Sequence, residues 1–131
     1  MKTARSTMTW LAAASALCVS PLPATAAQVV DIAWNDAGDF ERKLSVAPGS
    51  FVELCGALER GETVAWRFEA SGALDFNIHF HEGKAVRTPA RAEQARDARG
   101  KLSVESAQDY CWMWSNKAAA AASVQVQLEK R

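Results

Sequence analysis

The chain has 131 residues, of which 49% are hydrophobic and 23% are charged. This composition is that of an ordinary folded domain, and it excludes low-complexity and strongly disordered chains. The 15 basic and 15 acidic side chains cancel, so we expect no long-range attraction to nucleic acid. The length predicts one compact domain.

Residues 1–26 have the features of a secretory signal peptide. Lys2 and Arg5 precede an apolar run at residues 8–19, and residues 24–26 supply a small-x-small cleavage pattern. The apolar run has 12 residues. A helix that spans a bilayer needs about 20 residues, so a retained membrane span is not expected. We therefore predict cleavage after Ala26 and a periplasmic or secreted protein.

The predicted mature chain, residues 27–131, keeps two cysteines, Cys55 and Cys111, and 13 basic against 15 acidic side chains, a net charge of −2. In an oxidising compartment an even cysteine count favours a disulfide. A bridge that closes a loop of this length would stabilise the fold by about 4 kcal/mol in the chain-entropy model. Two free, buried thiols are the alternative.

Short runs with alternating apolar and polar residues dominate the mature chain and are separated by Gly, Pro, Asn and Asp. The runs are residues 29–34, 40–46, 51–55, 63–70, 74–81, 102–105, 109–115 and 123–129. Period-two alternation is typical of strands with one buried face. The sequence therefore predicts an all-β fold, a small two-sheet antiparallel sandwich of seven or eight strands.

Two segments lack this alternation. Residues 87–101 are rich in alanine and charge without an apolar stripe, which predicts a mobile loop with a helical turn. A patch for an anionic partner is the alternative there. Residues 118–122 are five alanines between two predicted strands, and we expect a loop because they cannot bury a distinctive face.

Two segments resemble a known family. Residues 74–86, LDFNIHFHEGKAV, resemble the strand, glycine turn and short strand of GOLD domains, the β-sandwich modules of early secretory-pathway cargo receptors. Residues 110–116, YCWMWSN, resemble that family's aromatic strand ending in Asn, and the likeness extends over about residues 44–129. The resemblance implies a binding module in which Cys55 and Cys111 join an early strand to the aromatic strand.

The two histidines, His79 and His81, lie on one face of a predicted strand, about 6.6 Å apart, so both can approach one metal ion. Cys111 and Met113 have the same spacing on another strand. If the strands are neighbours, a thiolate and a thioether would complete a soft site suited to copper(I). A disulfide would withdraw Cys111 and leave His79, His81 and Met113 as ligands.

A purely structural interpretation competes with the metal site. His79 and His81 would then be solvent-side residues of an amphipathic strand, and Met113 would fill a gap in the core. Zinc fits less well than copper because no fourth nitrogen, thiolate or carboxylate ligand is obvious, although Glu53 and Glu82 remain open as ligands.

Four aromatic residues, Trp66, Tyr110, Trp112 and Trp114, allow two interpretations. An exposed row would stack on sugars, whereas burial would supply much of the cohesion that a small domain needs. We expect core packing, with Asn116 capping the strand end through its side chain.

The sequence contains no phosphate-binding glycine loop, no Gly-x-Ser-x-Gly turn and no His-Glu-x-x-His motif. We therefore predict a non-enzymatic binding or interaction module with an unidentified protein partner and no cofactor. The alternative is a periplasmic copper-binding protein that uses His79, His81 and Met113.

Overall fold

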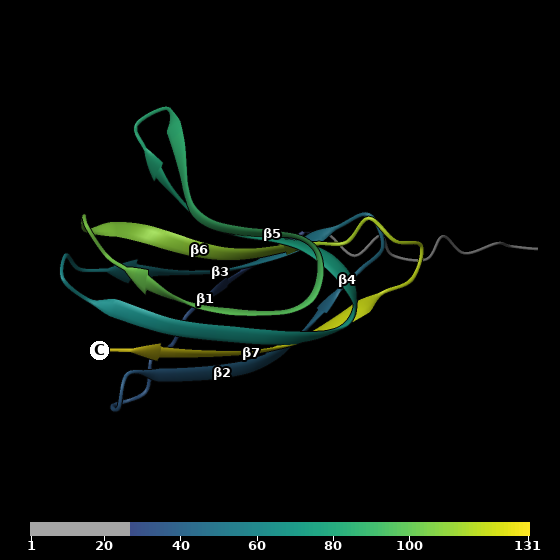
Figure 1. Ribbon diagram of the computed structural model, residues 1–131, viewed down its shortest axis with the longest axis horizontal. Coiled ribbons are helices and arrows are strands. Elements are labelled where there is room, and N and C mark those ends of the chain that lie inside the picture. Colours follow the sequence, from purple (N-terminus) through teal and green to yellow (C-terminus); the bar gives the residue numbers. More distant parts are fainter. Residues whose placement is uncertain (1–26) are drawn as a thin grey trace, which may run out of the picture.

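The computed structural model describes residues 27–131, and the predicted signal peptide with its cleavage site lies outside this range (Figure 1). Seven strands make up the fold: β1 (Gln28–Asp31), β2 (Asp39–Val46), β3 (Phe51–Leu58), β4 (Thr63–Glu82), β5 (Ala85–Ser103), β6 (Gln108–Ser115) and β7 (Ala122–Lys130). The described part of the chain contains no helix, so none there is long and apolar enough to cross a membrane. The all-β prediction is confirmed.

The strands form one curled sheet in the order β1-β3-β6-β4-β7-β2, with β5 on the other side of β4. The early part of β4, residues 63–70, pairs with β7, and the later part, residues 75–79, pairs with β6. Each part of β4 therefore belongs to a different half of the sheet, and the sheet folds over on itself (Figure 1). We predict two separate sheets from the alternation, whereas the structure has one continuous sheet.

The bend of the sheet lies within β4, between residues 63–70 and 74–81, which we predict as two separate strands. Around residues 70–73 the pairing of β4 with β5 shifts register, and a second shift follows between Leu74 and Phe76. Such bulges bend a strand and increase its twist. On β5 the bend contains Gln94, which has a positive φ of 47° and donates hydrogen bonds from its backbone and side-chain nitrogens to Oδ1 of Asp75.

The prediction of a mobile loop with a helical turn at residues 87–101 is wrong, because this segment forms most of β5. Its backbone is held by pairing with β4, which local periodicity does not reveal. Its small residues lie directly opposite large ones on β4. The pairs are Trp66–Gly100, Phe68–Ala98, Leu74–Ala95, Phe76–Ala92 and Ile78–Ala90.

The core fills the inside of the curl. Tyr110, Trp112 and Trp114 of β6 are almost fully buried there, as expected. Phe68 joins the two halves, with its ring 5.6 Å from that of Trp114 and 4.9 Å from that of Phe76, both centroid to centroid. Edge-to-face and tilted aromatic contacts of this kind add to the stabilisation from burial.

Asn116 follows directly after β6, where we predict a side-chain cap, and it also ties together two loops. Its Nδ2 donates to the carbonyl oxygens of Val46, 3.0 Å away, and Ala120, 2.8 Å away. Its Oδ1 accepts from the backbone nitrogen of Ala118. Residues 118–121 of the alanine segment are irregular, as predicted, whereas Ala122 is already the first residue of β7.

Candidate functional site

The outward side chains of β3, β6 and residues 75–81 of β4 form a surface that we call the disulfide face. Cys55 and Cys111 are direct partners across β3 and β6, and their sulfur atoms are bonded. The predicted disulfide is therefore present, as expected in a periplasmic or secreted protein. Because both sulfurs are bonded to each other, neither is a free thiolate ligand.

His79 lies beside the disulfide, opposite Cys111 on the neighbouring strand. Only 8% of the residue is exposed. Its Nδ1 is 2.8 Å from Oδ1 of Asn77, and its Nε2 is 4.0 Å from Oε1 of Glu53. Burial lowers the pKa of His79 below its usual value, while the Glu53 carboxylate raises it in part. The imidazole is therefore held mainly in its neutral form near pH 7.

Glu53 completes a tight group on this face. One side-chain ligand atom from each of Glu53, His79 and Cys111 lies within 4.8 Å of the other two. Oε2 of Glu53 also lies 3.8 Å from Sγ of Cys55, a contact without a shared proton because that sulfur is in the bridge. The carboxylate thus faces a disulfide and a neutral imidazole.

The structure brings the other predicted metal ligands onto the same face. The rings of His79 and His81 are 5.6 Å apart, centroid to centroid, and His81 is exposed. Met113 lies two residues after Cys111 on β6. It is paired with Glu53 of β3 on one side and with Asn77 of β4 on the other. Copper binding by His79, His81 and Met113 stays a prediction.

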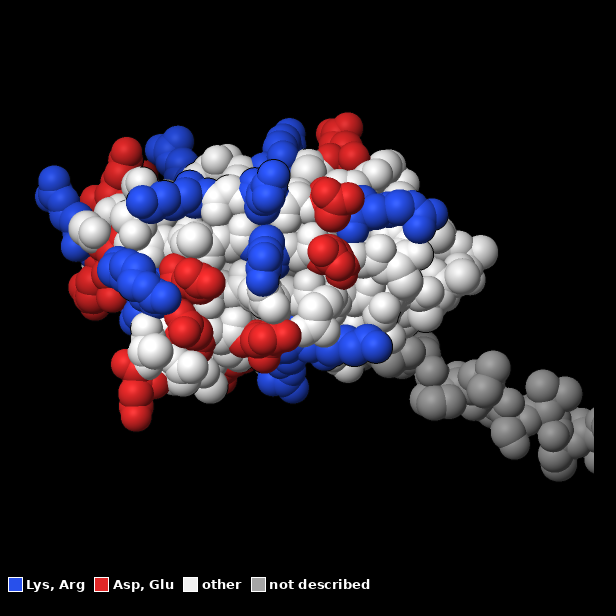
Figure 2. Space-filling view, turned by 60° about the horizontal axis from the view of Figure 1, so that its bottom comes forward, with Lys and Arg blue, Asp and Glu red and all other residues white. Residues whose placement is uncertain are grey.

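The opposite side of the curl presents what we call the charged face, made of the outward side chains of β2, β7, residues 63–70 of β4 and residues 95–103 of β5. Figure 2 shows basic and acidic side chains interspersed here, with basic ones in a column across the middle. Nε of Arg67 donates to Oε1 of Gln127, and Nε2 of Gln125 donates to Oε1 of Glu41 at 2.9 Å. Arg67 and Glu41 remain exposed, whereas Gln125 and Gln127 are half-buried.

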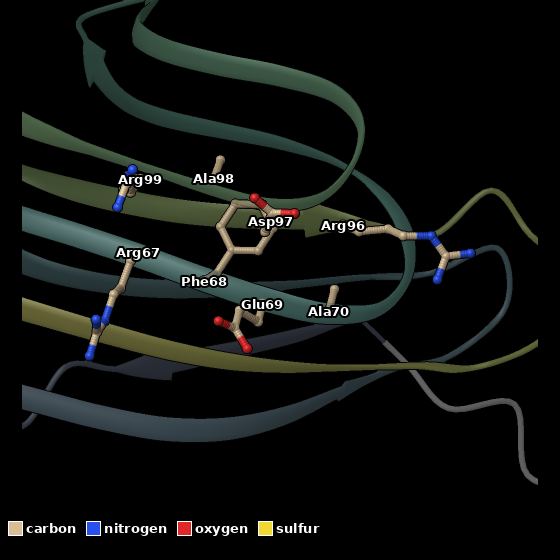
Figure 3. A pocket seen from close by; sticks show the side chains of 8 residues that line it. All are labelled: Arg67, Phe68, Glu69, Ala70, Arg96, Asp97, Ala98 and Arg99. Atoms are coloured by element: carbon tan, nitrogen blue, oxygen red, sulfur yellow. The ribbon is translucent and has the colours of Figure 1, made fainter.

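A hollow of about 520 Å³ lies on this face between β4 and β5. Arg67 and Arg99 lie at one end and Arg96 at the other, with Glu69 and Asp97 between them (Figure 3). The lining therefore holds three arginines and two acidic residues, and the Arg96 guanidinium extends away from the carboxylates to donate to the carbonyl oxygen of Ser71 at 3.0 Å. We call this feature the arginine hollow.

Two pairs of like charges are direct cross-strand partners in the arginine hollow, Arg67 with Arg99 and Glu69 with Asp97. Like charges in that position are destabilising. Within residues 27–131 the guanidinium of Arg99 makes no hydrogen bond or ion pair. An anionic group from another molecule would relieve the arginine repulsion.

The predicted aromatic site residues lie mostly inside the fold. Trp112 and Trp114 are fully buried, so they form no sugar-stacking platform. Trp66 is half-buried, packs 5.0 Å from the ring of Phe76, and lines a smaller hollow of about 320 Å³ beside Gly100. Of the four aromatics, Trp66 and Tyr110 line surface hollows, and Tyr110 is itself only 2% exposed.

Sequence reasoning offered residues 87–101 as a patch for an anionic partner only as an alternative to a loop, and it did not predict the arginine hollow. Arg96 and Arg99 lie in the segment predicted to be a loop, so nothing placed them beside Arg67. The available signal was the spacing of the small residues Ala98 and Gly100, which match large residues on β4.

The fold is similar to solved structures of bacterial proteins. Aeromonas hydrophila PliG, a periplasmic inhibitor of g-type lysozyme, matches with a TM-score of 0.66 and 13% identity over 81% of this chain and 98% of that chain. The corresponding inhibitor of Salmonella Typhimurium has a TM-score of 0.57 and 12% identity over 79% of this chain and 98% of that chain. The Yersinia pseudotuberculosis-derived mitogen matches at 0.55 and 9% identity, over 70% of this chain and 84% of that chain. No family model matches the sequence, and no curated protein does.

The resemblance to GOLD domains is wrong, because the structural neighbours are PliG inhibitors, which belong to a different fold family. The residues that suggested it serve general needs of a curled sheet. Alternating aromatics at residues 110–114 fill the core, and Asn116 ties two loops. Neither role is particular to one family.

Proposed function

We propose that the chain is an exported, non-enzymatic protein that binds and inhibits a glycan-cleaving enzyme of the g-type lysozyme class. The observation that carries this proposal is the extent of the structural match, which includes 98% of the Aeromonas hydrophila inhibitor at a TM-score of 0.66. The disulfide supports action in an oxidising compartment, where such an enzyme would be met.

The arginine hollow is the surface that best fits such a target. Glycoside hydrolases use a pair of carboxyl groups in a cleft, so an inhibitor that covers the cleft meets concentrated negative charge. Arg67 and Arg99 are adjacent and repel each other in the free protein, and carboxylates can accept paired hydrogen bonds from guanidinium groups. Arginine is also enriched among the residues that dominate protein interfaces.

The test measures how fast a purified g-type lysozyme clears a peptidoglycan suspension in the presence of the mature protein. We expect inhibition near equimolar ratio. The double variant Arg67→Gln, Arg99→Gln should weaken inhibition by about 10-fold or more, since interface arginines at such sites contribute more than about 1 kcal/mol each. Arg60→Gln, an exposed arginine in the β3–β4 turn, is the matched control and should inhibit normally.

The two parts of the proposal fail separately. No inhibition at a 100-fold excess of the unaltered protein, a ratio at which about 2.7 kcal/mol of lost affinity would still be overcome, contradicts the function. Full inhibition by the double arginine variant instead contradicts the assignment of the arginine hollow and leaves the function standing.

A further inference from the structure

On the disulfide face, Nε2 of His79 and Oε1 of Glu53 face each other without a hydrogen bond between them. Oδ1 of Asn77 can only accept a hydrogen bond, so at 2.8 Å the protonated Nδ1 of His79 donates to it. In the neutral imidazole the lone pair is then on Nε2. That atom faces Oε1 of Glu53 at 4.0 Å, beyond hydrogen-bonding distance. Two acceptors pointing at each other in a largely buried position are an arrangement that a cation satisfies.

The hydrogen bond from His79 to Asn77 matches a recurring feature of metal sites. A histidine that ligates a metal generally donates its other ring N–H to an oxygen acceptor, which fixes the tautomer and the ring orientation. Here Asn77 is two residues before His79 on the same strand, so alternation alone places the acceptor beside the ring. The ligand is therefore oriented before any metal arrives.

The distances suit a small divalent ion. Zinc bonds to imidazole nitrogen and carboxylate oxygen at about 2.0–2.2 Å, so one ion can join two atoms that are up to about 4.2 Å apart. The 4.0 Å between His79 and Glu53 is within that reach, and a turn of the flexible Glu53 side chain brings it to tetrahedral spacing.

A third ligand is next to this pair. His81 is exposed and lies on the same strand face, with its ring 5.6 Å from that of His79, so rotation of its side chain brings a ring nitrogen to the ion. We propose that Glu53, His79 and His81 bind one zinc-like divalent ion, with water completing the tetrahedron. This is the two-histidine, one-carboxylate set found in zinc proteins with one open position. The proposal stands apart from the proposed inhibition, which uses the other face.

The disulfide limits the choice of metal. Cys111 is part of the close group with Glu53 and His79, but its sulfur is bonded to Cys55 and supplies no thiolate. Without a thiolate the donors are two nitrogens and a hard oxygen, which suit zinc or copper(II). The soft copper(I) set of His79, His81 and Met113 is the competing assignment, and the variant Met113→Leu in the experiment below tests whether the thioether is a ligand.

The test is a calorimetric titration of ZnCl₂ into the mature protein at neutral pH, without an affinity tag, after chelator treatment and removal. A thiol assay on the same sample should find no free thiol. We expect one zinc per chain. His79→Gln, His81→Ala and Glu53→Gln should each lower the affinity about 10-fold or more, and Asn77→Leu should lower it about 10-fold through loss of the positioning hydrogen bond.

Two matched controls keep the proposal falsifiable. Met113→Leu lies on the same face and should leave zinc affinity unchanged, because a thioether is a soft ligand. Glu82→Gln removes an exposed carboxylate next to His81 and should also have no effect. Because His81 is exposed, His81→Ala should fold normally, which circular dichroism checks. No zinc binding, or binding insensitive to both His81→Ala and Glu53→Gln, overturns the proposal, as does affinity lost in Met113→Leu.

Discussion

The disulfide face and the charged face are made by the same curled sheet but differ in what their side chains contact. On the disulfide face, Cys55 and Cys111 are bonded, and His79 is almost buried between Asn77 and Glu53. On the charged face the side chains are exposed, and Arg99 has no partner within residues 27–131. Removal of the buried contacts on the first face should therefore alter stability, and changes on the second should alter binding of a protein partner.

Removal of the disulfide should have the largest effect. Cys55→Ala with Cys111→Ala removes a bridge across 56 residues, and we expect the free energy of unfolding to fall by about 4 kcal/mol. Urea unfolding measures it. Lys43→Ala on the charged face is the control, with an expected change within about 0.5 kcal/mol. If both variants lowered the free energy of unfolding equally, the two faces would not differ in their contribution to stability.

Asn116 ties the loop after β2 to the loop before β7. Its substitution should therefore have the second largest effect on stability. Asn116→Ala leaves the carbonyl oxygens of Val46 and Ala120 without their donor. Since each buried polar group left unpaired costs about 1–3 kcal/mol, we expect a loss of about 3 kcal/mol in urea unfolding. Ser115→Ala, the preceding residue, should be nearly neutral. A loss below 1 kcal/mol for Asn116→Ala would show that the two loops are not held by this side chain.

Gly100 tests the packing under the charged face. A Cβ there would lie 2.6 Å from Cζ2 of Trp66, whereas at Gly72 the nearest atom would be 3.6 Å away. Gly100→Ala should therefore destabilise the protein by about 1–3 kcal/mol through overpacking. Gly72→Ala should have a much smaller effect. In a double-mutant cycle, Trp66→Leu should relieve most of the cost of Gly100→Ala, and strict additivity would refute the contact.

The smallest predicted effect concerns pH. Hydrogen bonds from Lys117 and Gln94 lower the pKa of Asp75 to about 2 from its usual 3.8. The carboxylate therefore contributes stability above about pH 4, and this contribution is lost as the pH falls toward 2. The melting temperature of the unaltered protein should exceed that of Asp75→Asn at pH 5 and approach it at pH 2. A difference that stays constant with pH would contradict this.

The two strands of the β4–β5 hairpin differ in how well their structure could be predicted from the sequence. Residues 63–70 and 74–81 alternate clearly, so their strand character and buried faces were predictable. Their continuity was not, because the bulges that join them depend on pairing with β5. Residues 87–101 carry small and charged side chains, and only the large residues opposite them on β4 reveal their role.

The candidate sites follow the same rule. The common face of His79 and His81 follows from period two within one strand, and the bridge from Cys55 to Cys111 follows from an even count in an exported chain. The proximity of Glu53 to His79 depends on both β3 and β4 lying beside β6. Arg67 and Arg99 meet only because β5 is a strand. Contacts within one strand were predictable, and among these contacts between strands only the disulfide was.

The most direct measurement is the activity of a g-type lysozyme on peptidoglycan as the mature, disulfide-bonded protein is added in steps to a fixed amount of enzyme. If the chain is an inhibitor, activity should fall with an end point near one inhibitor per enzyme. Activity that stays constant up to a 100-fold excess would contradict the proposed function. At that excess, inhibition would be detected even if the binding free energy were about 2.7 kcal/mol weaker than is needed for an end point at one inhibitor per enzyme.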